Sequence, residues 1–110
     1  MSDYNYETIK ASVIRWYEKV LYELTGKDEI FLSKNSEKAL IIDFDFQNCL
    51  AQLSVTDSKF VPYQFVYFEA MDIETLNQIY CFYDDDTRQE RDVISALNEA
   101  LIFCLSYKVK

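Results

Sequence analysis

The 110-residue chain has no histidine, one glycine, one proline and three cysteines. Without imidazole it lacks the usual general base near neutral pH, the Ser-His and Cys-His nucleophile pairs, and the histidine metal ligand. With Gly26 as its single glycine, it cannot build a glycine-rich loop that holds phosphate groups. The sequence therefore argues against an enzyme, and we expect a non-catalytic protein with no cofactor.

Long apolar runs are also missing. The longest mainly apolar run, Ala100 to Leu105, is too short to cross a bilayer, and the first twenty residues carry several charges. We therefore expect neither a signal peptide nor a membrane anchor. Cys49, Cys81 and Cys104 form no C-x-x-C pair, which favours buried free thiols in a reducing cytoplasm over a zinc site or a disulfide framework.

Acidic residues are what the chain has in excess. Asp and Glu number 19 against 11 Lys and Arg, giving a net charge of −8. Eight of these acidic residues lie between Val61 and Asp92, a stretch with only two arginines. Such a charge repels nucleic-acid phosphates and anionic lipids and attracts basic proteins. We expect a basic protein partner, with no direct binding of nucleic acid or membrane.

Two segments have helical periodicity. From Asp3 to Thr25 apolar residues recur every three or four positions, which predicts an amphipathic helix that ends at Gly26. A second apolar stripe runs from Val93 to Leu105. Two pairs have the spacing of a capping box at the start of this second helix: Asp86 with Gln89, and Thr87 with Glu90.

Between the helices the period changes to two, which is typical of strands. The predicted strands are Lys38 to Phe46, Leu50 to Thr56, Tyr63 to Ala70 and Leu76 to Tyr83, with Glu29 to Leu32 as a short extra candidate. The third and fourth are apolar or aromatic on both faces, which favours a more central position in the sheet or cover on both sides. Short links predict an antiparallel meander; they are Gln47-Asn48, Asp57-Ser58-Lys59 and Met71 to Thr75.

These elements predict an α+β fold in a single domain over residues 1–110. Because each helix has one apolar stripe, we expect the N-terminal and C-terminal helices to pack on one face of a four- or five-stranded antiparallel sheet. Trp16 and Leu97 lie on the two stripes and are predicted core residues. The other sheet face is then left uncovered.

The uncovered face is the candidate partner-binding site. Asp43 and Asp45 alternate with the apolar residues of one strand and would reach this face. Tyrosines of the later strands would join them, either with Tyr67 and Tyr80 or with the alternate set, because the sequence does not fix the register. Tyrosines and carboxylates together are typical of protein interfaces. The alternative is that the aspartates are a solvated strand face and the tyrosines are core.

Further candidate residues come from the acidic stretch. The three aspartates at 84–86 could clamp basic side chains of a partner or could cap the second helix. The remaining acids extend a local negative zone that capping alone does not require. The candidates from this stretch are Glu69, Asp72, Glu74, Asp84 and Asp85. Residues 43–47 (DFDFQ) echo a calcium loop but lack its turn glycine and distal glutamate, so we expect no metal site.

In size, local acidity and element order, the chain resembles several families of small cytoplasmic bacterial immunity proteins, including those of contact-dependent growth inhibition and related polymorphic-toxin systems. The resemblance is architectural and compositional, with no signature motif. It implies inhibition of a cognate toxin, often a basic nuclease, by covering its active site or an adjacent surface. The alternatives are an acidic secretion chaperone for an effector, which usually has a helix among its strands, and a DNA-mimic inhibitor. An exposed aromatic face could also form a homodimer.

Overall fold

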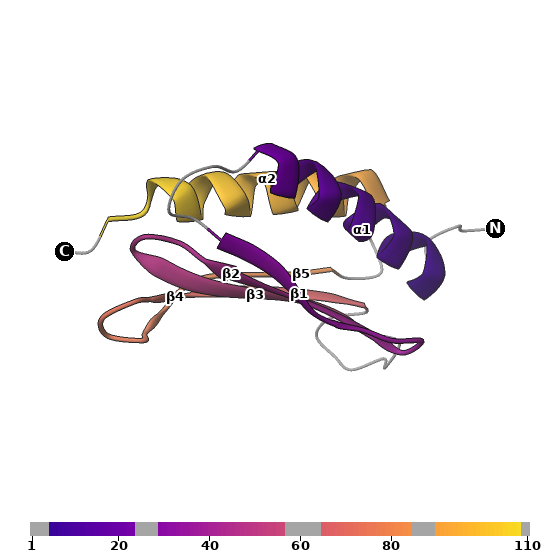
Figure 1. Cartoon of the computed structure of the whole chain (residues 1–110), viewed down its shortest axis with the longest axis horizontal. Coiled ribbons are helices and arrows are strands. Elements are labelled where there is room, and N and C mark those ends of the chain that lie inside the picture. Colours follow the sequence, from indigo (N-terminus) through magenta and orange to yellow (C-terminus); the bar gives the residue numbers. More distant parts are fainter. Residues whose placement is uncertain (1–4, 24–28, 57–64, 85–89, 109–110) are drawn as a thin grey trace.

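The computed structural model describes residues 5–23, 29–56, 65–84 and 90–108. Two helices flank five strands along the chain (Figure 1). In order, the elements are α1 (Tyr6–Glu23), β1 (Glu29–Asn35), β2 (Ala39–Asp45), β3 (Cys49–Thr56), β4 (Val66–Asp72), β5 (Gln78–Tyr83) and α2 (Glu90–Ser106).

The five strands form one antiparallel sheet in the order β1-β2-β3-β4-β5. Both helices lie on the same face of this sheet and run in the same direction (Figure 1). The α+β two-layer arrangement predicted from the sequence is therefore confirmed. Neither described helix has the length and apolar content that crossing a bilayer would need.

Helix α1 begins three residues later than the periodicity predicts. Asn5 caps it, because its side-chain oxygen accepts a hydrogen bond from the backbone N–H of Thr8 at 2.9 Å. Glu7 in the first turn suits the positive end of the helix dipole. Both the predicted stop at Gly26 and the two capping pairs before α2 involve residues outside the described ranges.

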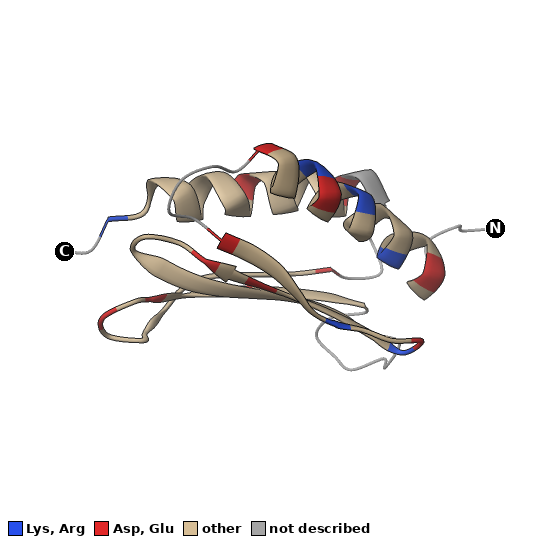
Figure 2. Ribbon diagram, viewed as in Figure 1, with Lys and Arg blue, Asp and Glu red and all other residues tan. Residues whose placement is uncertain are grey.

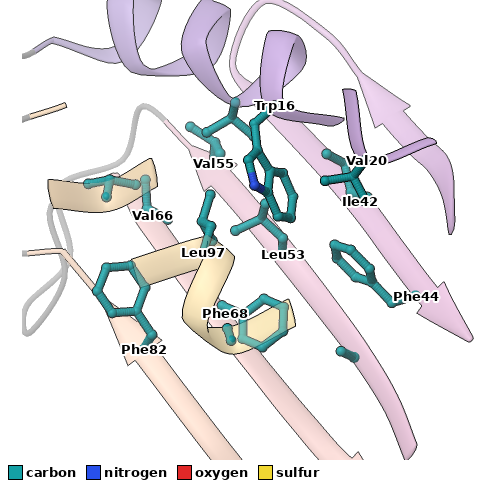
Figure 3. Close-up of a cluster of buried hydrophobic side chains, with 14 of the residues drawn as sticks. Trp16, Val20, Ile42, Phe44, Leu53, Val55, Val66, Phe68, Phe82 and Leu97 are labelled. Carbon is teal, nitrogen blue, oxygen red and sulfur yellow. The ribbon is translucent and has the colours of Figure 1, made fainter. Parts of the chain in front are cut away.

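The core lies between the helices and the sheet (Figure 3). Trp16 from α1 and Leu97 from α2 are 5% and 0% exposed, so their predicted core positions are confirmed. The Trp16 ring lies 6.1 Å from that of Phe44, and Phe44 packs edge-on against Phe68 at 5.7 Å. The indole N–H of Trp16 also donates to the Asn98 side-chain oxygen at 2.8 Å. This bond joins the helices and satisfies the indole donor beside the core.

Strands β2 and β3 have the predicted alternation. Leu40, Ile42 and Phe44 are buried under the helices, and the intervening residues point to the other face. The Gln47-Asn48 link is a tight turn, closed by the N–H of Phe46 donating to the carbonyl of Cys49 at 3.0 Å. The short strand candidate becomes a full edge strand, β1, in the structure.

The prediction that the last two strands are more central or covered on both faces holds only in part: β4 lies between β3 and β5 in the sheet, but neither strand is covered on both faces. Every second residue of β4 is only half-buried, and β5 is an edge strand with Cys81 and Tyr83 exposed. The physical reason is that both helices lie on one side, while tyrosine tolerates half exposure because its apolar ring has a polar tip. Exposed Cys81 also departs from the expected buried thiols, whereas Cys49 and Cys104 are buried.

The links around β4 also differ from the short loops predicted. Strand β3 ends at Thr56 and β4 begins at Val66; the predicted link at residues 57–59 and Tyr63, the predicted first residue of the next strand, lie outside the described ranges. Before β5, Leu76 has a φ of 61°, a left-handed conformation that is uncommon for a residue with a branched side chain. Leu76 therefore belongs to the turn, and β5 begins at Gln78.

Candidate partner-binding face of the sheet

The sheet face opposite the helices, called here the open face, takes every second residue of each strand. Residues paired across neighbouring strands share a face, so the register of the sheet identifies its members. They are Glu29, Phe31, Ser33, Lys34, Ala39, Ile41, Asp43, Asp45, Leu50, Gln52, Ser54, Thr56, Tyr67, Glu69, Met71, Gln78, Cys81 and Tyr83.

A polar row crosses the middle of this face. Asp43, Gln52, Glu69 and Cys81 are partners in register on four successive strands. The side-chain amide of Gln52 donates to Oδ1 of Asp43 at 2.9 Å, and the hydroxyl of Ser33 donates to Oδ2 of the same carboxylate. Both Asp43 oxygens therefore have fixed partners, and the carboxylate is held in one orientation.

The other end of the row is held by Tyr67. Its hydroxyl donates to Oε2 of Glu69 at 3.2 Å. A hydrogen bond with Cys81, burial of the ring and the Glu69 charge all raise the pKa of Tyr67 above its ordinary value. The phenol therefore remains protonated over the physiological range, and it keeps its role as a donor to Glu69.

Beside the row the open face has a hollow of about 330 Å³, the central hollow. One part of its lining is apolar and comes from Phe31, Leu50 and Met71. The other part carries the polar groups of Asp43, Asp45, Gln52 and Glu69. Pockets that bind side chains or small ligands combine apolar walls with a few placed polar groups in this way.

The charge of this region is one-sided. Among the described residues, no lysine or arginine forms an ion pair with Asp43, Asp45 or Glu69, and no cationic side chain lines the central hollow. In the described part of the sheet the cations are Lys34 and Lys38, both at the β1–β2 hairpin (Figure 2). Asp45 lies at the opposite end of β2. Lys34 shares the open face at the hairpin end, opposite Ile41, whereas the carboxylates around the apolar hollow have no paired cation among the described residues.

The structure brings four of the predicted site residues together. Asp43, Asp45, Tyr67 and Glu69 all lie on the open face, on three neighbouring strands. Tyr80 does not join them. It faces the helices, where its ring packs 4.9 Å from Phe103 of α2 and 6.1 Å from Phe68. Burial raises the pKa of Tyr80, and its role in the structure is packing.

Asp72 is the last residue of β4 and Glu74 lies in the β4–β5 turn, both outside the polar row. Asp72 is 6% exposed, and its Oδ1 accepts the backbone N–H groups of Glu74 and Thr75 at 2.8 and 2.9 Å. Its Oδ2 accepts the hydroxyl of Tyr107 at 2.5 Å. This bond, followed by the backbone bonds, lowers the pKa of Asp72, and it raises the pKa of Tyr107 to about 12. Asp72 thus joins the turn to the end of α2, and Glu74 remains exposed.

Asp84 has a structural position too. It is 0% exposed, and its carboxylate accepts the backbone N–H of Phe65 at 2.9 and 3.1 Å and that of Val66 at 2.8 Å. Those bonds fix the start of β4, so this carboxylate is not available as an exposed clamp. Asp85 lies outside the described residues.

Six lining residues of the central hollow were not among the predicted site residues: Phe31, Phe44, Leu50, Ala51, Gln52 and Met71. Leu50 has the same strand parity as Gln52, and Met71 the same parity as Glu69, so alternation alone could have assigned both to the open face. Phe31 could not be found in this way, because it reaches the hollow only through the pairing of β1 with β2 opposite Asp43. The described residues include no group of three or more acidic or cysteine side chains placed to hold a metal ion.

No family model, curated protein or solved structure matches this chain. Its function is therefore argued from the open face itself.

Proposed function

We propose that this chain is a non-catalytic protein-binding domain that neutralises a basic protein partner through its open face, in the manner of an immunity protein that binds a cognate toxin. The observation that carries the proposal is the uncovered sheet face, on which Asp43, Asp45 and Glu69 surround an apolar hollow with no cation paired to them among the described residues.

The size of the face suits a protein partner. Five strands about 4.8 Å apart, with about 3.3 Å per residue along each strand, give a surface roughly 20 Å on each side. A standard protein interface buries about 800 Å² on each partner, about twice the roughly 400 Å² of this face, so a partner of that size would also contact the rim of the sheet. Tyr67, Tyr83 and Phe31 provide the aromatic area that interface hot spots favour.

The charge suits a basic partner. A net charge of −8 accelerates the approach of a basic protein and opposes that of nucleic acid. Specificity would come from the match between fixed carboxylates and basic side chains, together with the aromatic contacts. This combination supports a binding inhibitor over a protein that acts on phosphate-containing substrates.

The structure also bears on the two alternatives. A secretion chaperone would usually place a helix among its strands, and the described residues contain no helix between β1 and β5. A DNA mimic needs carboxylates exposed along a ridge, but Asp72 and Asp84 are buried in hydrogen bonds within the fold. Both observations favour the immunity-type inhibitor.

The test compares three forms of the purified chain, each immobilised and exposed to lysate of its native host at low and at high salt. They are the wild type, a triple variant of the open face, D43N/D45N/E69Q, and a matched variant of exposed α1 residues, E7Q/E18Q/E23Q. Each variant removes three negative charges. A difference in captured protein between the two variants therefore reflects where the charges lie on the chain and not the net charge.

We expect one basic protein to bind the wild type and the α1 variant, to bind the open-face variant much less, and to dissociate as salt rises. Production of that protein in cells should be toxic, and the wild-type chain should suppress the toxicity. Equal capture by all three forms, or a captured protein whose activity the chain does not suppress, would contradict the proposal.

A further inference from the structure

The central hollow has the two kinds of lining that a long cationic side chain needs. Its apolar part, Phe31, Leu50 and Met71, can contact methylene groups, and its polar part offers acceptors from Asp43 and Glu69. Lysine and arginine side chains bury their stems along apolar surface and keep the charged end in a polar setting. The hollow of about 330 Å³ is large enough to receive one side chain and part of its backbone.

The acceptors have a spacing that suits a planar, two-sided donor. Gln52 separates Asp43 from Glu69 in register, so the two carboxylates stand two strand spacings apart, about 10 Å between Cα atoms. A guanidinium with a hydrogen bond of about 2.9 Å on either side spans roughly 8 Å between the two acceptor oxygens, which side chains that start about 10 Å apart can flank by leaning toward each other. Ser33, Gln52 and Tyr67 already hold the two carboxylates, which reduces the entropy lost when a ligand binds.

We propose that the central hollow receives an arginine side chain of the partner, with its guanidinium between Asp43 and Glu69 and its stem against Leu50 and Met71. The inference rests on the proposed function, since it names the group by which a basic partner is recognised. Arginine fits better than lysine because its flat guanidinium offers five donors and can stack on the ring of Phe31, whereas an ammonium is a compact, strongly hydrated charge.

The test uses small probes and needs no knowledge of the partner. The probes are acetyl-Gly-Arg-Gly-amide, the same tripeptide with lysine, and the same tripeptide with citrulline, whose neutral urea has the shape of a guanidinium. Each is titrated to tens of millimolar into the isotope-labelled chain at low salt. Binding is followed by amide correlation spectra, in which the side-chain NH₂ of Gln52 reports directly from the floor of the hollow.

We expect the arginine peptide to shift the Gln52 side-chain signal and the backbone signals of Leu50 and Glu69. The lysine peptide should bind more weakly, and the citrulline peptide should leave these signals unchanged. Loss of two charge-assisted hydrogen bonds should weaken arginine binding about tenfold or more in D43N/E69Q. The matched variant E7Q/E18Q, with two exposed glutamates of α1 changed, should bind like the wild type.

Phe31 supplies a second variant. F31L keeps an apolar wall but removes the aromatic ring. It should therefore weaken binding of the arginine peptide more than binding of the lysine peptide, which reduces the difference between the two affinities. The inference is overturned if arginine and citrulline peptides shift the same signals equally, or if no signal of the hollow responds to arginine. Well-dispersed spectra of each variant establish that the fold is intact.

The two proposals can fail separately. If the chain captures and neutralises a basic protein but the arginine peptide does not bind in the hollow, the inference fails and the proposed function stands. If the peptide binds as expected but no protein is neutralised, the hollow is a guanidinium site and the proposed function fails.

Discussion

Removal of the Asp84 carboxylate tests whether this acid serves the fold or a partner. In Asp84→Ala, the buried backbone N–H groups of Phe65 and Val66 lose the acceptor that they contact at 2.8 to 3.1 Å. Because Asp84 is 0% exposed, water does not readily replace the carboxylate. The start of β4 would then carry buried donors without an acceptor.

The magnitude follows from the number of donors. A buried donor without a partner costs about 1–3 kcal/mol, so two such donors predict a loss of about 3 kcal/mol in the free energy of unfolding. That is a large share of the roughly 5–15 kcal/mol by which a domain is stable. Asp84→Asn keeps one acceptor oxygen but loses the charge, and we expect about half of this loss.

Urea unfolding measures the effect. Trp16 is the single tryptophan of the chain and is 5% exposed, so its fluorescence reports loss of the core, and circular dichroism provides a second probe. The control is Glu74→Ala, which removes the same charge from an exposed side chain and should change stability by less than about 0.5 kcal/mol. If Asp84→Ala unfolds at the same urea concentration as this control, the reasoning about buried hydrogen bonds is refuted.

Three further predictions concern side chains that contact or follow α2 and side chains on the open face. Tyr107→Phe should lower the thermal midpoint most near neutral pH. The lowered pKa of Asp72 gives stability that is lost as pH falls through that pKa. The raised pKa of Tyr107 gives stability that is lost as pH rises from about 10 to about 12. If the difference in thermal midpoint between the wild type and Tyr107→Phe were the same at every pH, this reasoning would be contradicted. Tyr80→Ala should lower the free energy of unfolding by about 2 kcal/mol because it loses ring contacts under α2, whereas Tyr67→Ala should weaken partner binding by about 2 kcal/mol. Urea unfolding and binding titrations measure the two effects. If Tyr67→Ala lost stability and Tyr80→Ala lost binding instead, the roles assigned to the two tyrosines would be wrong. Cys81 is the exposed thiol and should react with maleimide before the other two cysteines, as peptide mass mapping can show. A bulky adduct on Cys81 should block partner binding. If the modified chain binds its partner normally, the interface lies elsewhere.

Helices and strands could be told apart in the sequence because burial of one side repeats apolar residues every second position in a strand and every three or four positions in a helix. Asp43 and Asp45 alternate with the core residues of β2, so their position on the open face could be predicted without knowing any neighbour. The same logic placed Trp16 and Leu97 in the core. In each case the inference needs only residues of one continuous segment.

Whether two residues on different strands share a sheet face was not predictable in the same way. Tyr67 and Tyr80 were expected together, but they lie on opposite faces. Alternation fixes faces within one strand, whereas the link between strands depends on the turn, and here the β4–β5 pairing shifts register between Ala70 and Met71. A shift of one residue exchanges the two faces of a strand.

The sequence by itself determined the element order, the α+β class, the excess of acid, the absence of histidine and the lack of a glycine-rich loop. Tertiary structure decided which carboxylates are buried and which are exposed, because Asp84 meets backbone donors of Phe65 and Val66 about twenty residues before it in the chain. It also assembled the central hollow, whose lining from Phe31 to Met71 comes from four strands. Such contacts depend on strand pairing across the sheet, and local periodicity does not encode that pairing.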